Sequence, residues 1–120
     1  MKNKKVVGKA LGRIPSGLFV VTAKCEDKED AVLASWVNQC SFDPPALTIT
    51  LATLRSARLL VEASGAFIVN VLPKDDKTLL KHFSRPPEDI FKGVKTKKGL
   101  DGIRILSDAV AYMECEVAQA

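Results

Sequence analysis

Residues 33–45, with the sequence LASWVNQCSFDPP, are the stretch that says most about the fold and its ligand. The small residues Ala34 and Ser35 end an apolar run, and Trp36 follows them directly. Small side chains let a flat ligand approach a strand backbone closely, and a tryptophan offers a large rigid surface. A planar heterocycle is bound by such apolar walls with a few polar groups. A purely structural alternative stays open, in which Trp36 is a core residue and Ser41 caps the turn that follows.

A second stretch, residues 52–56 (ATLRS), lies where a predicted strand gives way to a predicted helix. The first turn of a helix presents unpaired N–H groups and a partial positive charge, which suit a phosphate group. Arg55 adds a guanidinium that can bind phosphate through two hydrogen bonds. Thr53 and Ser56 add hydroxyls, and Arg58 can reinforce them. The alternative is an ordinary helix start, with Ser56 as the N-cap and a solvated arginine.

Outward from these two stretches, the hydrophobic pattern predicts a mainly β fold. Apolar residues at helical spacing predict helices over residues 4–14, 57–63 and 76–83. Alternating or β-branched residues predict strands over residues 18–23, 31–37, 46–52, 66–72, 103–106 and 110–117, with a charged loop over residues 88–102. Such a set closes as a β-barrel with short flanking helices packed outside. The length of 120 residues predicts one domain, residues 1–120.

Composition and charge exclude several other classes of protein. Apolar residues make up 47% of the chain, which is too many for a disordered protein. The net charge of +4 does not indicate nucleic-acid binding by itself, and no apolar run reaches the roughly 20 residues of a membrane span. The three cysteines and His82 are too dispersed for a zinc site. Scattered cysteines favour a reduced, intracellular protein.

Several motifs, taken in their order along the chain, resemble the flavin reductase-like FMN-binding family, which folds as a split β-barrel. They are residues 34–36 (ASW), 41–45 (SFDPP), 55–56 (RS) and 64–72 (SGAFIVNVL). Three further segments are similar to the C-terminal flavin reductase module of the flavodiiron proteins of oxygenic phototrophs: residues 12–18 (GRIPSGL), 81–83 (KHF) and 109–117 (AVAYMECEV). Each motif alone is weak, but the ordered set covers essentially the whole chain.

The resemblance implies where FMN is bound. In the family, the strand that matches residues 33–37 lies along the isoalloxazine, and the segment that matches Cys40 and Ser41 lies near the ring and the ribityl chain. The turn that matches residues 52–56 binds the phosphate. The residues expected to bind FMN are therefore Leu33, Ala34, Ser35, Trp36, Val37, Cys40, Ser41, Thr53, Arg55 and Ser56. Because the flavin carries the redox chemistry, neither a catalytic proton-transfer residue nor a metal ligand is expected.

The resemblance also implies a function. It is that of an NAD(P)H-dependent flavin reductase, an FMN-binding oxidoreductase that passes electrons from NAD(P)H through FMN to an acceptor. The acceptor implied is a diiron domain or protein, and the assembly implied is a homodimer with flavin sites at the subunit interface. Residues 81–83 match a segment near the cofactor or the dimer partner. A cytoplasmic location is expected, with neither a nucleic acid nor a membrane as a partner.

The end of the sequence keeps two alternatives open. Family members continue, after the strand that matches residues 114–117, into a Gly-Asp-His segment on the nicotinamide side of the flavin and into further strands. The C-terminal part of the family domain is therefore expected to be missing, because the chain is either a cut domain or a reduced member of the family. This leaves the barrel incomplete and one sheet edge unpaired. The alternatives are a non-enzymatic flavin-binding or electron-transfer protein without a nicotinamide site, and a structural remnant without flavin.

Overall fold

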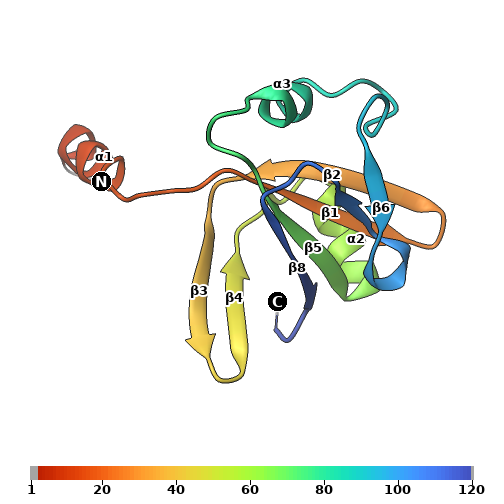
Figure 1. The fold of residues 1–120 in the computed structure, drawn as a ribbon. Coiled ribbons are helices and arrows are strands. Elements are labelled where there is room, and N and C mark those ends of the chain that lie inside the picture. Colours follow the sequence, from red (N-terminus) through yellow and green to blue (C-terminus); the bar gives the residue numbers. More distant parts are fainter. Residues whose placement is uncertain (1–2, 120) are drawn as a thin grey trace.

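A four-stranded antiparallel sheet stands at the centre of the protein, as the computed structural model shows for residues 3–119 (Figure 1). Its strand order is β2-β1-β5-β8. The strands are β1 Phe19–Cys25, β2 Lys28–Ala34, β5 Ala66–Val71 and β8 Ala111–Glu116. Val, Ile, Phe and Thr dominate β1 and β5, and these residues favour the extended backbone of a sheet. The strands predicted for these two segments are therefore confirmed.

Helix α2 (Ser56–Ser64) covers one face of this sheet. It places Ala57 and Val61 against inward-facing side chains of β1, β2 and β5. The helix ends at Gly65, whose φ of 75° lies in the left-handed region that glycine adopts at low cost. The turn at Gly65 returns the chain to the sheet, where β5 begins at the next residue, Ala66.

Helix α3 (Thr78–Ser84) lies on the opposite face of the sheet. Its residues Leu79 and Phe83 pack with Val20 of β1 and with Leu106. Because apolar layers cover both faces, β1 and β5 are apolar at nearly every position instead of alternating. The near-continuous apolar run in β5 thus reflects burial on two sides.

The remaining elements form two small sheets and a detached helix (Figure 1). They are α1 Lys4–Leu11, β3 Val37–Phe42, β4 Pro45–Ile49, β6 Thr96–Lys98, a 3-10 helix Leu100–Gly102 and β7 Arg104–Leu106. Strands β3 and β4 pair as an antiparallel ribbon that extends away from the central sheet, and β6 pairs with β7. Within residues 3–119 the sheets do not close into a barrel. The predicted mainly β class is confirmed, with the barrel open.

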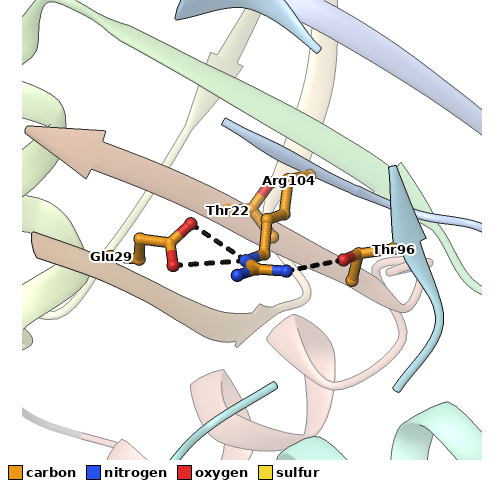
Figure 2. A network of polar contacts seen from close by, with 4 residues as sticks. All are labelled: Thr22, Glu29, Thr96 and Arg104. Carbon is orange, nitrogen blue, oxygen red and sulfur yellow. Dashed lines mark hydrogen bonds and ion pairs between the residues drawn. The ribbon is translucent and has the colours of Figure 1, made fainter. Parts of the chain in front are cut away.

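A polar network fastens β7 to the central sheet (Figure 2). The hydroxyl of Thr22 donates to the carbonyl of Arg104 over 2.7 Å. The Arg104 guanidinium donates to both carboxylate oxygens of Glu29 at 3.0 and 3.2 Å, and to the hydroxyl of Thr96 at 2.9 Å. Each of the four residues has a polar partner within the network, which indicates a structural role.

Some predicted boundaries were wrong. Residues 38–42 belong to β3 although their polar composition predicts no strand, because a projecting ribbon needs no apolar face. Strand β2 starts earlier than predicted, since a two-residue turn with Glu26 at φ 58° joins it to β1. The predicted loop over residues 88–102 contains β6 and the 3-10 helix. Strand β8 is mostly exposed, not half-buried.

Helix α1 stands apart from the rest of the chain (Figure 1). None of its residues is buried, and Val6, Leu11 and the following Ile14 expose about 60% or more of their surface. The predicted apolar face of this helix is therefore present, and within residues 3–119 most of it is exposed. None of the helices in this described range has the length and apolar composition needed to cross a membrane.

Candidate cofactor-binding site

A groove of about 350 Å³ lies between the N-terminal segment and the link from β2 to β3. On one side it is lined by Ser35, Trp36 and Asn38. On the other it is lined by Leu11, Ile14, Pro15 and Ser16. Its volume lies within the range of pockets that take small ligands, and its mixture of apolar walls and a few polar groups is typical of them.

The sequence expectation of a flat-ligand site at Ser35 and Trp36 fits this geometry. Both residues lie in the short link between β2 and β3. Trp36 is 65% exposed, so it is not a core residue. Its carbonyl accepts a hydrogen bond from the N–H of Thr50 over 3.1 Å, which fixes the backbone of the link. The indole is therefore held at the groove with most of its surface free.

The other residues predicted around the ring contribute in different ways. Ala34 is buried against the α2 side of the sheet, and Leu33 packs on the α3 side. Val37 is half-buried against the same apolar cluster as Ala34. Their side chains are thus committed to the core, and only their backbone groups can face a ligand.

Cys40 and Ser41 lie farther along the ribbon. The β3–β4 register shifts between Gln39 and Ser41, which leaves Cys40 as the extra residue of a β-bulge. Cys40 is exposed and Ser41 half-buried. Neither residue lines the groove, so the structure does not bring them together with Trp36.

The predicted phosphate turn is the start of helix α2. Arg55 occupies the N-cap position with an extended backbone, and no side chain caps the helix there. The Arg55 side chain is exposed and makes no hydrogen bond or ion pair within residues 3–119. Thr53 is also exposed. An unengaged guanidinium beside uncapped N–H groups is suited to an anion.

Two side chains near Arg55 are already engaged. Arg58 donates to the carbonyl of Thr53 over 3.1 Å and pairs with Glu62 at 2.9 Å, so its guanidinium is held on the helix. The hydroxyl of Ser56 donates to the carboxylate of Asp30 in β2. Ser56 is the first residue of the helix and not its N-cap, so the predicted capping role was wrong. Sequence patterns did not indicate Asp30, since it lies 26 positions from Ser56.

Strand β2 links the groove to the start of α2. Asp30, near one end of the strand, contacts Ser56, and Ala34 at the other end precedes the groove residues Ser35 and Trp36. Four residues of extended strand span about 13 Å. A ligand with a planar ring at the groove and an anionic group on a flexible chain could follow this strand from one end to the other.

His82 lies outside the groove. Its Nε2 is 2.7 Å from the carbonyl of Ile90, and its ring stacks edge-on against Phe83 at 4.7 Å between centroids. This contact fastens α3 to the loop that follows it. The structure thus gives His82 a packing role, and the predicted proximity of residues 81–83 to a cofactor remains a prediction.

Among the residues that the structure describes, two ionisable groups have shifted pKa values, and neither lies at the groove. Hydrogen bonds from the hydroxyl and the N–H of Thr78 lower the pKa of Asp76. Partial burial raises the pKa of the Cys115 thiol on β8. The groove itself is lined by apolar, hydroxyl and amide side chains. Its residues are suited to holding a ligand that brings its own reactivity.

The comparison with known proteins assigns this geometry to a family. Residues 11–120 match the family described as Flavin reductase like domain. The chain belongs to this family. Diflavin flavoprotein A 1 of Synechocystis sp. is 44% identical over 114 residues, which cover 92% of this chain and 20% of that protein. The chain therefore spans about a fifth of the length of this relative.

Solved structures share the fold of this chain. A putative oxidoreductase from Sinorhizobium meliloti is 32% identical with a TM-score of 0.82, and the match covers 97% of this chain and 41% of that one. A putative flavin reductase from Haemophilus somnus is 22% identical with a TM-score of 0.83, over 98% of this chain and 76% of that one. The predicted split-barrel fold and the kinship with flavodiiron flavoproteins are confirmed. These findings support a flavin as the class of cofactor.

Proposed function

We propose that residues 1–120 form one FMN-binding domain of an NAD(P)H-dependent flavin reductase-type oxidoreductase. The observation that carries this proposal is the groove beside Trp36 at one end of β2, with Ser56 at the start of α2 in contact with Asp30 near the other end. The match of residues 11–120 to the flavin reductase like domain supports the cofactor class. When bound, FMN would supply hydride and single-electron transfer.

The residues of the groove would hold the ring of FMN and exclude water from one of its faces. Trp36 and Ile14 offer apolar surface, and Ser35 and Asn38 offer hydrogen-bonding groups for the polar edge of a heterocycle. The backbone of Leu33, Ala34 and Val37 continues this edge. The volume of the groove and its mixture of apolar and polar lining support this assignment.

The start of α2 would hold the phosphate. Arg55 is free to pair with it, and the uncapped N–H groups of the first helical turn add hydrogen-bond donors. Thr53 is exposed beside them. Cys40 and Ser41 do not line the groove. They would contact FMN only if the β3–β4 ribbon moved toward it, or if the ribbon of a second subunit reached it.

We further propose that the protein is a homodimer. A compact monomer of 120 residues exposes about 6,300 Å², whereas this chain exposes 8741 Å². The difference exceeds the roughly 800 Å² that each partner buries in a standard interface. The radius of gyration of 15.2 Å also exceeds the value of about 13.6 Å expected for a compact domain. Sedimentation velocity would show a single species of twice the monomer mass if this is correct.

The electron acceptor that we propose is a diiron domain or protein, and the location is the cytoplasm. The resemblance to the flavodiiron proteins implies this acceptor, and the similarity to a diflavin flavoprotein over a fifth of that relative's length supports the resemblance. Cys25, Cys40 and Cys115 are free thiols, which is common in reducing compartments.

Titration of the purified protein with FMN tests the proposal. We expect saturable binding with one FMN per chain, followed through the change in the visible flavin spectrum. A protein that takes up no FMN at any concentration would contradict the proposal and favour a structural remnant. A protein that binds FMN but transfers no electrons from NADH or NADPH would be the non-enzymatic flavin binder.

A further inference from the structure

We propose that Asp30 weakens the binding of phosphate at the start of α2. Its carboxylate accepts the only hydroxyl hydrogen of Ser56 and adds a negative charge beside the first turn of the helix. The inference rests on the proposed FMN site and concerns its ligand preference. It assigns Asp30 as a residue that weakens the contact with a phosphate monoester. Phosphate binding then depends chiefly on Arg55.

The hydrogen bonds of Asp30 define its role. One carboxylate oxygen accepts the hydroxyl hydrogen of Ser56, and the other accepts the N–H of Ala31 over 2.8 Å. A serine hydroxyl has a single hydrogen to donate. While Asp30 holds that hydrogen, Ser56 can only accept, and a phosphate dianion has only acceptor oxygens.

The charge of Asp30 acts in the same direction. A carboxylate in contact with the first residue of α2 opposes the partial positive charge of the helix start. The nearby Arg58 does not compensate, since it is paired with Glu62 and bonded to the Thr53 carbonyl. Of the side chains around this turn, Arg55 alone offers an unengaged positive charge within residues 3–119.

The substitution Asp30→Asn tests these two effects while position 30 keeps Ala31 and Ser56 as its hydrogen-bond partners. Asparagine keeps an oxygen that can accept the N–H of Ala31, and its amide can donate to the Ser56 oxygen. The Ser56 hydrogen is then free for phosphate, and one negative charge is removed. At pH 8, where a phosphate monoester is a dianion, we expect FMN to bind about tenfold more tightly. Riboflavin, which lacks the phosphate, should change by less than about twofold.

Ser56→Ala provides an independent measurement. In the otherwise unchanged chain it should alter FMN affinity by less than about twofold, because the hydroxyl is not available to phosphate. In the Asp30→Asn background the same change should weaken FMN by about threefold or more. This non-additivity is the signature of two residues that share one hydrogen bond. The matched control is Asp75→Asn, which removes an exposed negative charge in the loop before α3.

Dissociation constants for FMN and riboflavin decide between the outcomes. The inference is overturned if Asp30→Asn leaves FMN binding unchanged or weaker, or if Ser56→Ala in the unchanged chain weakens FMN about tenfold. The second result would show that Ser56 donates its single hydrogen to phosphate and not to Asp30. A chain that binds neither FMN nor riboflavin, with or without Asp30→Asn, would refute the proposed FMN site itself, and the riboflavin arm separates that failure from failure of the inference.

Discussion

Asn70 and Thr22 form a hydrogen-bonded pair inside the central sheet, with 3.3 Å between the Asn70 Nδ2 and the Thr22 Oγ1. Both side chains are fully buried. The Asn70 amide also donates to the carbonyl of Val20 over 3.0 Å and accepts the N–H of Leu106 over 2.9 Å. One asparagine side chain thus connects β1, β5 and β7, and it sets the position of β7 on the sheet.

Replacement of Asn70 by leucine should therefore destabilise the fold. The change leaves the buried carbonyl of Val20 and the buried N–H of Leu106 without their side-chain partner. We expect the free energy of unfolding to fall by about 2–4 kcal/mol, measured by urea denaturation. Asn38→Leu, at an exposed position of β3, is the control and should change stability by less than about 0.5 kcal/mol. Equal losses of unfolding free energy in the two variants would show that the buried amide of Asn70 contributes no more to stability than the exposed amide of Asn38.

Arg55→Ala should weaken the affinity for FMN and leave the affinity for riboflavin nearly unchanged. A charge-assisted hydrogen bond contributes about 1.5–3 kcal/mol, so the loss of this guanidinium should weaken FMN roughly 10- to 100-fold. Riboflavin affinity should stay nearly the same. Arg85→Ala, which removes an exposed arginine at the end of α3, is the matched control. If riboflavin weakens as much as FMN does, Arg55 does not contact the phosphate.

Trp36 should report on flavin binding directly. The chain contains one tryptophan, and its indole is 65% exposed at the groove. A flavin ring bound there should quench the tryptophan fluorescence. The fluorescence titration and the flavin spectrum should give the same dissociation constant. Emission that stays constant at saturating FMN would place the ring away from the groove.

Protonation of Asp76 at low pH should weaken the start of helix α3. The Thr78 hydroxyl and N–H donate to Asp76 over 2.6 and 2.9 Å, and these bonds lower its pKa from the usual 3.8. A lowered pKa in the folded state means that the stabilisation is present above pH 3.8 and is lost as the pH falls through the folded-state pKa. An NMR titration of the Asp76 carboxyl should give a midpoint below 3.8. The Thr78→Val variant should raise that midpoint; an unchanged midpoint would show that the hydroxyl does not hold the carboxylate.

The sequence predicted the parts of this fold that depend on local apolar patterns. Strand β5 and helix α2 could be predicted because their apolar residues and the glycine at position 65 are close together in the chain. Strand β3 could not be predicted, since its polar side chains lie on an exposed ribbon. An incomplete barrel was expected from the family resemblance, and within residues 3–119 the sheets do not close. The strand order β2-β1-β5-β8 could not be predicted, because it depends on contacts between distant segments.

The candidate site shows the same division. Ser35, Trp36 and Arg55 were indicated by their neighbours in the sequence, and the structure leaves their side chains exposed at the groove or at the start of α2. The contact between Asp30 and Ser56 joins two segments that no local pattern relates. The N-terminal wall of the groove was likewise not predicted, because its residues serve as a ligand surface only once the chain has folded.

Anaerobic reduction of the FMN-loaded protein is the measurement that tests the central claim most directly. The account predicts that FMN bound to this chain loses its yellow absorbance when NADH or NADPH is added, with a rate that saturates in the nicotinamide concentration. Arg55→Ala should show the same reduction only at higher FMN concentration. Bound FMN that stays yellow with both nicotinamides, in a protein shown to be fully loaded, would contradict the proposed reductase function.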